Sequence, residues 1–194
     1  MTVAQDASRP DPRTGVRRWQ TDWLMLAIGA AVLATDQITK AAIVATFASS
    51  PPGTAIEVLG PYLRLVYVTN TGAAFGLFQG LTPVLAAISL VSVPVLLYVR
   101  AKLPARYATG LVRFTLGLLL GGALGNFVDR AGQGYVVDFI DMGIGGLRWF
   151  PYNVSDASFV VGVAILAVYV LLTPEGPLVE SGTQPAAGSD DRPL

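Results

Sequence analysis

The sequence contains no histidine and no cysteine, so any catalytic chemistry must use other side chains. This absence excludes Ser-His and Cys-His catalysis, disulfides, thiolate metal sites and the usual zinc ligands. An enzyme with this composition would have to transfer protons through aspartate, glutamate, lysine or tyrosine. The candidates are polar residues within or beside long apolar segments: Asp36, Lys40, Asn70, Asn126, Arg130, Asp138, Asn153 and Asp156.

The elements that must position these residues are typical of a membrane protein. Of the 194 residues, 53% are hydrophobic and only 13% are charged, about half the charged fraction of a soluble domain. The formal net charge is zero, so no overall positive field favours nucleic acid. Four apolar segments are near the roughly 20 residues needed to cross a bilayer: residues 23–48, 81–99, 111–127 and 156–172.

We expect three parts along the chain. Residues 1–22 are interpreted as a mobile cytoplasmic tail, and residues 23–173 as one four-helix membrane domain with outward segments 49–80 and 128–155. Residues 174–194 are rich in proline, glycine and acidic residues, which is typical of a disordered tail. The first apolar segment could instead belong to a cleaved signal peptide, but three further spans argue against this alternative.

Basic residues indicate the orientation of the spans. They are concentrated in the N-terminal segment, at Arg9, Arg13, Arg17 and Arg18, and in the connection between the second and third spans, at Arg100, Lys102, Arg106 and Arg113. The positive-inside rule therefore places both termini and this connection in the cytoplasm.

The outward segments contain two strand candidates, residues 62–69 and 134–140, which are rich in β-branched and aromatic residues. The predicted fold class is an all-α membrane protein with four transmembrane helices and a small extracytoplasmic β-sheet formed by the outward loops.

The polar candidates converge at one depth in this arrangement. At a rise of about 1.5 Å per residue, Asp36 lies roughly 20 Å along the first helix from Trp23, and Lys40 lies one turn further on the same face. The other candidates lie at the outer ends of spans or in the outward segments. Because polar groups in a membrane are costly, this convergence indicates a functional site just below the outer surface.

Several of these residues also have a purely structural interpretation. Asp36 and Lys40 are spaced i,i+4 and can neutralise each other, which is the role we favour for them. Asp156 could cap the fourth helix together with Asn153 and Ser155. For Arg130, an interfacial charge and a functional role stay equally open.

Other residues receive only the structural interpretation. Gly117, Gly121 and Gly125 recur every four residues, which favours close helix packing over a phosphate-binding loop. Asp129 is interpreted as an ordinary interfacial charge, and Asp141 as a solvated loop charge.

The order of motifs along residues 23–172 resembles the lipoprotein signal peptidase (signal peptidase II) family of bacteria. Five motifs carry the resemblance: Asp36-Gln37-Ile38-Thr39-Lys40, Asn70 to Gly76 (NTGAAFG), Gly121 to Asn126 with Asp129-Arg130, Val136 to Ile140 (VVDFI), and Tyr152 to Asp156 (YNVSD). Each motif is weak alone, but five in order on a four-span topology are specific. In the last motif Tyr152, Ser155 and Ala157 stand where the family usually has Phe, Ala and Ser, which affects local packing rather than the chemistry.

The resemblance implies an intramembrane aspartyl endopeptidase that removes the signal peptide from diacylglyceryl-modified prolipoproteins, just before the lipidated cysteine. Asp138 and Asp156 would form the catalytic dyad and share one proton, because two carboxylates in a poorly hydrated site cannot both ionise cheaply. Which of the two is acid and which is base stays open. The implied substrate-binding residues are Asn70, Gly72, Gly122, Asn126, Arg130 and Asn153.

No metal or other cofactor is required by this chemistry. The expected partners are lipid-modified prolipoproteins and membrane lipids, with no nucleic acid, and the protein is expected to be a monomer. Its expected location is the bacterial cytoplasmic (inner) membrane, with the active site near the outer face.

Two alternatives come from other functional classes. A small transporter or proton channel could use Asp36, Lys40, Asp138 and Asp156 as a relay, but its charges should then be spread through the membrane depth. A non-catalytic assembly factor could use the polar cluster to hold helices together, and it would tolerate Asp-to-Asn changes.

Overall fold

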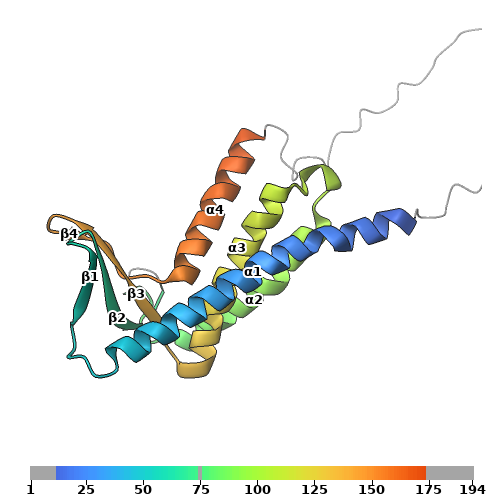
Figure 1. Cartoon of the computed structure of the whole chain (residues 1–194). Helices are drawn as coiled ribbons and strands as arrows, with labels where there is room; N and C mark the ends of the chain where they lie inside the picture. The colour runs from blue at the N-terminus through green and yellow to red at the C-terminus, as the bar shows by residue number, and fades with distance from the viewer. Residues whose placement is uncertain (1–11, 74–75, 174–194) are drawn as a thin grey trace, which may run out of the picture.

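Four long helices dominate the structure, a computed structural model that describes residues 12–73 and 76–173, with side chains from Asp22 onward except that of Ala105 (Figure 1). The helices are α1 (Pro12–Phe47), α2 (Thr82–Lys102), α3 (Gly110–Gln133) and α4 (Val154–Leu172), and a short 3-10 turn, η2 (Ala105–Tyr107), precedes α3. The strands are β1 (Ala55–Leu59), β2 (Leu63–Asn70), β3 (Val136–Ile144) and β4 (Leu147–Arg148). All four helices are long and apolar enough to cross a membrane.

Helix α3 is the centre of the bundle, and its glycines let the other helices approach it closely. A Cβ atom on Gly117 would lie 2.8 Å from the backbone oxygen of Met25, and one on Gly121 would lie 2.7 Å from that of Gly29. Gly122 faces α4 in the same way, since its Cβ would lie 2.6 Å from the backbone oxygen of Ser155. The packing interpretation of the glycine spacing is confirmed.

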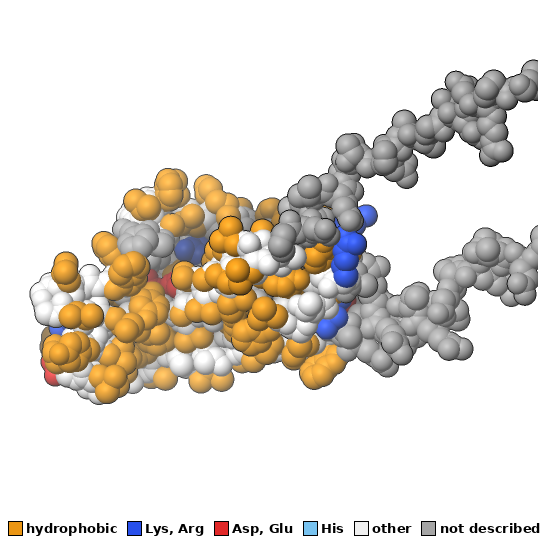
Figure 2. Space-filling view, turned by 90° about the horizontal axis from the view of Figure 1, so that it is seen from above, with side chains coloured by type: hydrophobic (Ala, Val, Ile, Leu, Met, Phe, Trp, Pro, Cys, Tyr) orange, Lys and Arg blue, Asp and Glu red, His pale blue; other side chains and the backbone are white. Residues whose placement is uncertain are grey.

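The helices bury apolar side chains against α3 and present others to the surroundings. The inner cluster consists of Met25, Val112, Leu116, Leu119 and Leu120. Helices α2 and α4 are mostly exposed along their length, and Figure 2 shows hydrophobic side chains covering most of the visible helical surface. An exposed apolar surface of this extent is stable in lipid rather than in water.

The strands form one antiparallel sheet in the order β1-β2-β3-β4 at one end of the bundle (Figure 1). Side chains alternate between the two faces of a strand, and Val137 and Phe139 of β3 pack with Ile43 and Phe47 at the end of α1. Asp138 therefore faces the opposite side of β3. The sheet itself and the two predicted strands are confirmed, while β1 and β4 were not predicted.

Helix α1 begins earlier than the sequence suggested. Residues 12–22, which we assigned to a mobile cytoplasmic tail, continue the helix to Pro12, and their mobility stays a prediction. Proline is tolerated in the first turn because its missing N–H would be unpaired there, and no further proline occurs between Pro12 and Pro51. The remaining tail predictions, for residues 1–11 and 174–194, lie outside the described residues.

Candidate functional site

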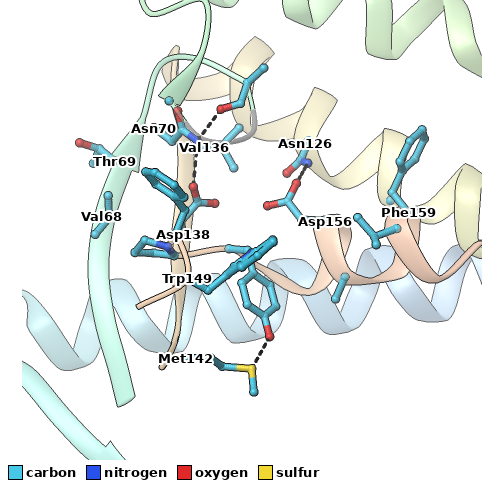
Figure 3. A pocket seen from close by; sticks show the side chains of 18 of the residues that line it. Val68, Thr69, Asn70, Asn126, Val136, Asp138, Met142, Trp149, Asp156 and Phe159 are labelled. Carbon is cyan, nitrogen blue, oxygen red and sulfur yellow. Dashed lines mark hydrogen bonds between the residues drawn. The ribbon is translucent and has the colours of Figure 1, made fainter. Parts of the chain in front are cut away.

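Two aspartates from different elements face each other at the junction of sheet and helices. Asp138 comes from the middle of β3 and Asp156 from the first turn of α4. Figure 3 shows their carboxylates pointing toward one another across a cavity. The cavity has a volume of about 1310 Å³ and both aspartates line it, which is more room than the roughly 300–1,000 Å³ of a typical small-molecule site.

The start of α4 is held by a capping box, which sets the position of Asp156. The side-chain oxygen of Asn153 accepts a 2.9 Å hydrogen bond from the Asp156 backbone, and the Asp156 carboxylate accepts one of 3.3 Å from the Asn153 backbone. Such reciprocal bonds satisfy backbone donors that a helix leaves unpaired. The capping role considered for Asp156 is thus real, and it coexists with a carboxylate that reaches the cavity.

Asparagine side chains orient both carboxylates. Asn126 of α3 donates a 2.7 Å bond to Asp156 Oδ1. Asn153 Nδ2 donates to Asp138 Oδ1 at 2.8 Å, and Asn70, at the end of β2, donates to Asp138 Oδ2 at 2.9 Å. Because each carboxylate accepts from two groups, the two are held in one orientation each.

The environment of Asp138 favours its protonated form. Only 2% of this residue is exposed. Burial, followed by the negative charge of Asp156, raises the pKa of Asp138 from 3.8 to about 7 despite the hydrogen bonds from Asn70 and Asn153. A carboxyl group in this range can hold or release a proton near neutral pH, as general acid–base chemistry requires.

Arg130 is a third charged group that lines the cavity. Its Nη2 donates a 3.0 Å bond to the backbone oxygen of Gly72, which ties the end of α3 to the loop after β2. Its buried Nε has no hydrogen-bond partner among the described residues. Arg130 therefore offers a charged donor to a polar group entering the cavity.

A buried ion cluster lies behind the two aspartates. Lys40 Nζ lies 2.6 Å from Asp36 and 2.8 Å from Asp129, and all three residues are at least 95% buried. Gln37 donates a further 2.9 Å bond to Asp129. The predicted Asp36–Lys40 pair is present, but the interpretation of Asp129 as an ordinary interfacial charge is wrong, because helix periodicity places it on the face of α3 that carries Gly125 and packs on α1.

The ion cluster also reaches α4. Asp36 Oδ1 accepts a 2.9 Å bond from the backbone N–H of Ser155, so a residue of α1 holds the turn that carries Asp156. Lys40 lies 3.4 Å from the side-chain oxygen of Asn126. One polar network thus connects the structural ion pair to the facing aspartates.

Asp141 is likewise not a solvated loop charge. It lies in β3, only 4% exposed, and accepts a 2.6 Å bond from Arg64 and a 2.7 Å bond from Arg148. Strand pairing places Arg64 directly opposite Asp141, and such a partner cannot be seen without the register of the sheet. Asp141 therefore links three strands and has a structural role.

Six of the eight predicted site residues line the cavity, namely Asn70, Gly122, Asn126, Arg130, Asp138 and Asp156. Gly72 and Asn153 do not line the cavity but bond residues that do. The Gly72 backbone oxygen accepts a hydrogen bond from Arg130, and the Asn153 side chain donates one to Asp138. The sequence motifs did not identify the aromatic wall on the sheet side, formed by Tyr62, Trp149, Phe150 and Tyr152. The concentration of aromatic residues at 149–152 was the available signal.

Comparison with known proteins agrees with this arrangement. A family model described as signal peptidase (SPase) II matches residues 28–172. A lipoprotein signal peptidase of Moorella thermoacetica is 42% identical over 164 residues, covering 84% of this chain and 99% of that protein. A lipoprotein signal peptidase of Methylobacterium sp. is 42% identical over 146 residues, covering 75% of this chain and 87% of that protein.

Solved structures show the same architecture. Two structures of bacterial membrane enzymes obtained by the in meso method are similar to this chain. One, at 2.3 Å resolution, has a TM-score of 0.68 and 33% identity and covers 76% of this chain and 87% of its own. The other, at 1.9 Å, has a TM-score of 0.66 and 32% identity and covers 78% and 94%.

Proposed function

Because the chain belongs to the signal peptidase II family, and hence to the membrane peptidases that process lipoprotein signal peptides, we propose that it is an aspartic endopeptidase acting on diacylglyceryl-modified prolipoproteins. It cleaves the peptide bond just before the lipidated cysteine. The observation that carries this proposal is the pair of carboxylates, Asp138 and Asp156, facing each other in one cavity (Figure 3).

The chemistry is hydrolysis by one ionised and one protonated carboxyl group. The ionised carboxylate takes a proton from water as the water oxygen bonds to the scissile carbonyl carbon. The protonated carboxyl donates its proton to the carbonyl oxygen, so that a neutral tetrahedral diol forms. As the C–N bond breaks, the leaving amine takes a proton from the first carboxyl, and the second recovers its proton as the C=O bond reforms.

We assign different roles to the two aspartates. Asp138, with its pKa raised to about 7 chiefly by burial, holds the shared proton and polarises the carbonyl. We assign the ionised form, which activates the water, to Asp156, with Asn126 and the Asn153 backbone donating to its oxygens. Two carboxylates with environments that differ in this way can divide acid and base roles.

Arg130 and Asn70 support the substrate around this pair. Arg130, which lines the cavity, donates to a backbone carbonyl of the substrate. Asn70 accepts from the Gly72 backbone and donates to Asp138, which holds the loop after β2 against the dyad. Positioning of this kind contributes to catalysis by fixing the reacting atoms before reaction.

The site lies near the outer face of the bacterial cytoplasmic membrane, with both termini in the cytoplasm. Arg100 and Lys102 lie in the last turn of α2 and Arg106 in the turn that follows it, and Figure 2 shows basic side chains gathered at the end farthest from the sheet. The positive-inside rule assigns that end to the cytoplasm. The diacylglyceryl chains of the substrate then stay in the outer leaflet beside the dyad.

A relay function has less support. Asp22 and Arg100 mark one end of the spans, and Asp36 marks the depth of the site. Between these two levels, the described parts of the spans carry no charged residue apart from Arg113 in the first turn of α3. A proton pathway across the membrane needs titratable groups through its depth. The carboxylates are instead gathered beside the sheet.

Incubation of the purified protein with a lipidated prolipoprotein tests the proposal directly. We expect release of the intact signal peptide and a mature protein that begins with the lipidated cysteine, both identified by mass spectrometry. The same prolipoprotein without the diacylglyceryl group should remain uncleaved. Absence of cleavage by folded protein, or cleavage at another bond, would refute the assignment.

A further inference from the structure

The side chain of Tyr152 lies on the cavity wall, and its hydroxyl is hydrogen-bonded to a weak acceptor. Its hydroxyl donates to the sulfur of Met142 at 2.8 Å, and both residues line the cavity that holds Asp138 and Asp156. Figure 3 shows this bond ending on Met142, on the same side of the two carboxylates as Trp149. A thioether is a weak acceptor, so the hydroxyl can leave it at little cost.

Backbone hydrogen bonds fix the position of Tyr152 and therefore the region that its hydroxyl can reach. Tyr152 exchanges hydrogen bonds of 3.1 and 2.8 Å with Ile140, and its carbonyl also accepts from Phe139, the neighbour of Asp138. Tyr152 therefore has a fixed position relative to the dyad. The Met142 side chain is 45% exposed and has three rotatable bonds, so it can move away without disturbing the strand.

The two walls of the cavity face different parts of a bound substrate. Ile88 and Ser92 of α2 and Val160 of α4 line the membrane side, which suits the apolar signal helix. Tyr62, Met142 and Tyr152 line the sheet side, past which the chain must leave the membrane after the cysteine. A donor on the sheet wall thus meets the substrate beyond the scissile bond.

We propose that the Tyr152 hydroxyl is a substrate-binding donor that exchanges the Met142 sulfur for a backbone carbonyl in the segment following the lipidated cysteine. This inference rests on the proposed peptidase function and adds a binding contact on the mature side of the cleavage point. Burial raises the pKa of Tyr152 above 10.0, so the hydroxyl keeps its proton at neutral pH.

Steady-state kinetics on a lipidated peptide substrate test the contact. Tyr152→Phe keeps the ring and the backbone bonds, so we expect KM to rise about 3–10-fold with kcat unchanged, the effect of one lost neutral hydrogen bond. Met142→Leu removes only the competing acceptor, so KM should stay equal or fall. Tyr67→Phe is the matched control, because the hydroxyl of Tyr67 bonds Tyr135 and its side chain does not line the cavity.

A truncated substrate locates the contact. On a lipidated peptide that ends at the cysteine amide, Tyr152→Phe and the unchanged protein should have the same KM. The inference is overturned by an unchanged KM on the long substrate, by an equal KM penalty on both substrates, or by a Met142→Leu penalty as large as that of Tyr152→Phe. Failure of the unchanged protein to cleave either substrate would refute the peptidase function instead.

Discussion

The side-chain amide of Asn153 donates a 2.8 Å hydrogen bond to the carboxylate of Asp138, which joins the cap of α4 to the middle of β3. Asn153 is completely buried and is also the capping residue for the turn that carries Asp156. The separation of the two aspartates is therefore set by a rigid polar contact and not by the exposed loop that precedes α4.

Asp138→Asn and Asp156→Asn should each lower kcat by about 10³-fold or more while leaving lipidated substrate bound, since an amide cannot exchange a proton. The double variant should be little worse than either single one, because the two groups act as a unit. Glu57→Gln, an exposed change on β1, is the control. Near-normal turnover in either single variant, with binding and turnover measured separately, would disprove the dyad.

The pH profile should report the proton on Asp138. Since the pKa of Asp138 is raised from 3.8 to about 7, the protonated form is present below about pH 7 and is lost as pH rises through that value. We expect kcat/KM on a substrate without titratable side chains to decline above about pH 7. A flat profile up to pH 9 would show that Asp138 does not supply the proton.

Lys40→Met should reduce folding yield more than turnover per folded molecule. Lys40 lies within 2.8 Å of both Asp36 and Asp129, so its loss leaves two buried carboxylates without a cation. Leaving a buried charge unpaired costs roughly 3–5 kcal/mol. Adding Asp129→Asn to Lys40→Met should recover part of the yield, as measured by size-exclusion chromatography in detergent. A well-folded, substrate-binding but inactive Lys40→Met protein would instead indicate a catalytic lysine.

Asp141→Asn should weaken the sheet by about 1.5–3 kcal/mol, the range for hydrogen bonds to charged groups. Burial alone would raise the pKa of Asp141, but hydrogen bonds from Arg148 and Arg64 outweigh it and hold that pKa below 3.8. The stability is therefore present above about pH 4 and is lost as pH falls through the lowered pKa. The melting temperature should drop at pH 7, and the difference should shrink in acid; a constant difference would contradict this linkage.

Topology reporters test the orientation. A fusion after Thr109 should read cytoplasmic and a fusion within residues 51–60 should read external, because basic residues are concentrated between α2 and α3. Opposite results at both positions would place the sheet and the dyad on the cytoplasmic side. The reporter should be inserted into the full-length chain as a sandwich fusion, so that no part of the protein is removed.

The sequence alone determined the membrane architecture. Each span is recognisable because a helix must supply about 20 apolar residues to cross the bilayer, whatever the rest of the chain does. The glycines of α3, the Asp36–Lys40 spacing and the convergence of polar residues at span ends are local patterns of the same kind. They were sufficient to predict four helices, a sheet beside them and a cluster of polar residues at the junction of the two.

Only the tertiary structure decided the environment of each charge. Asp129 and Asp141 look like surface charges in sequence, yet both are buried, because their partners Lys40 and Arg64 come from distant segments. Asp138 and Asp156 are neighbours only because the asparagine cap of α4 bonds across to β3. Burial and charge pairing depend on which segments pack together, and sequence spacing does not contain that information when the segments are far apart in the chain.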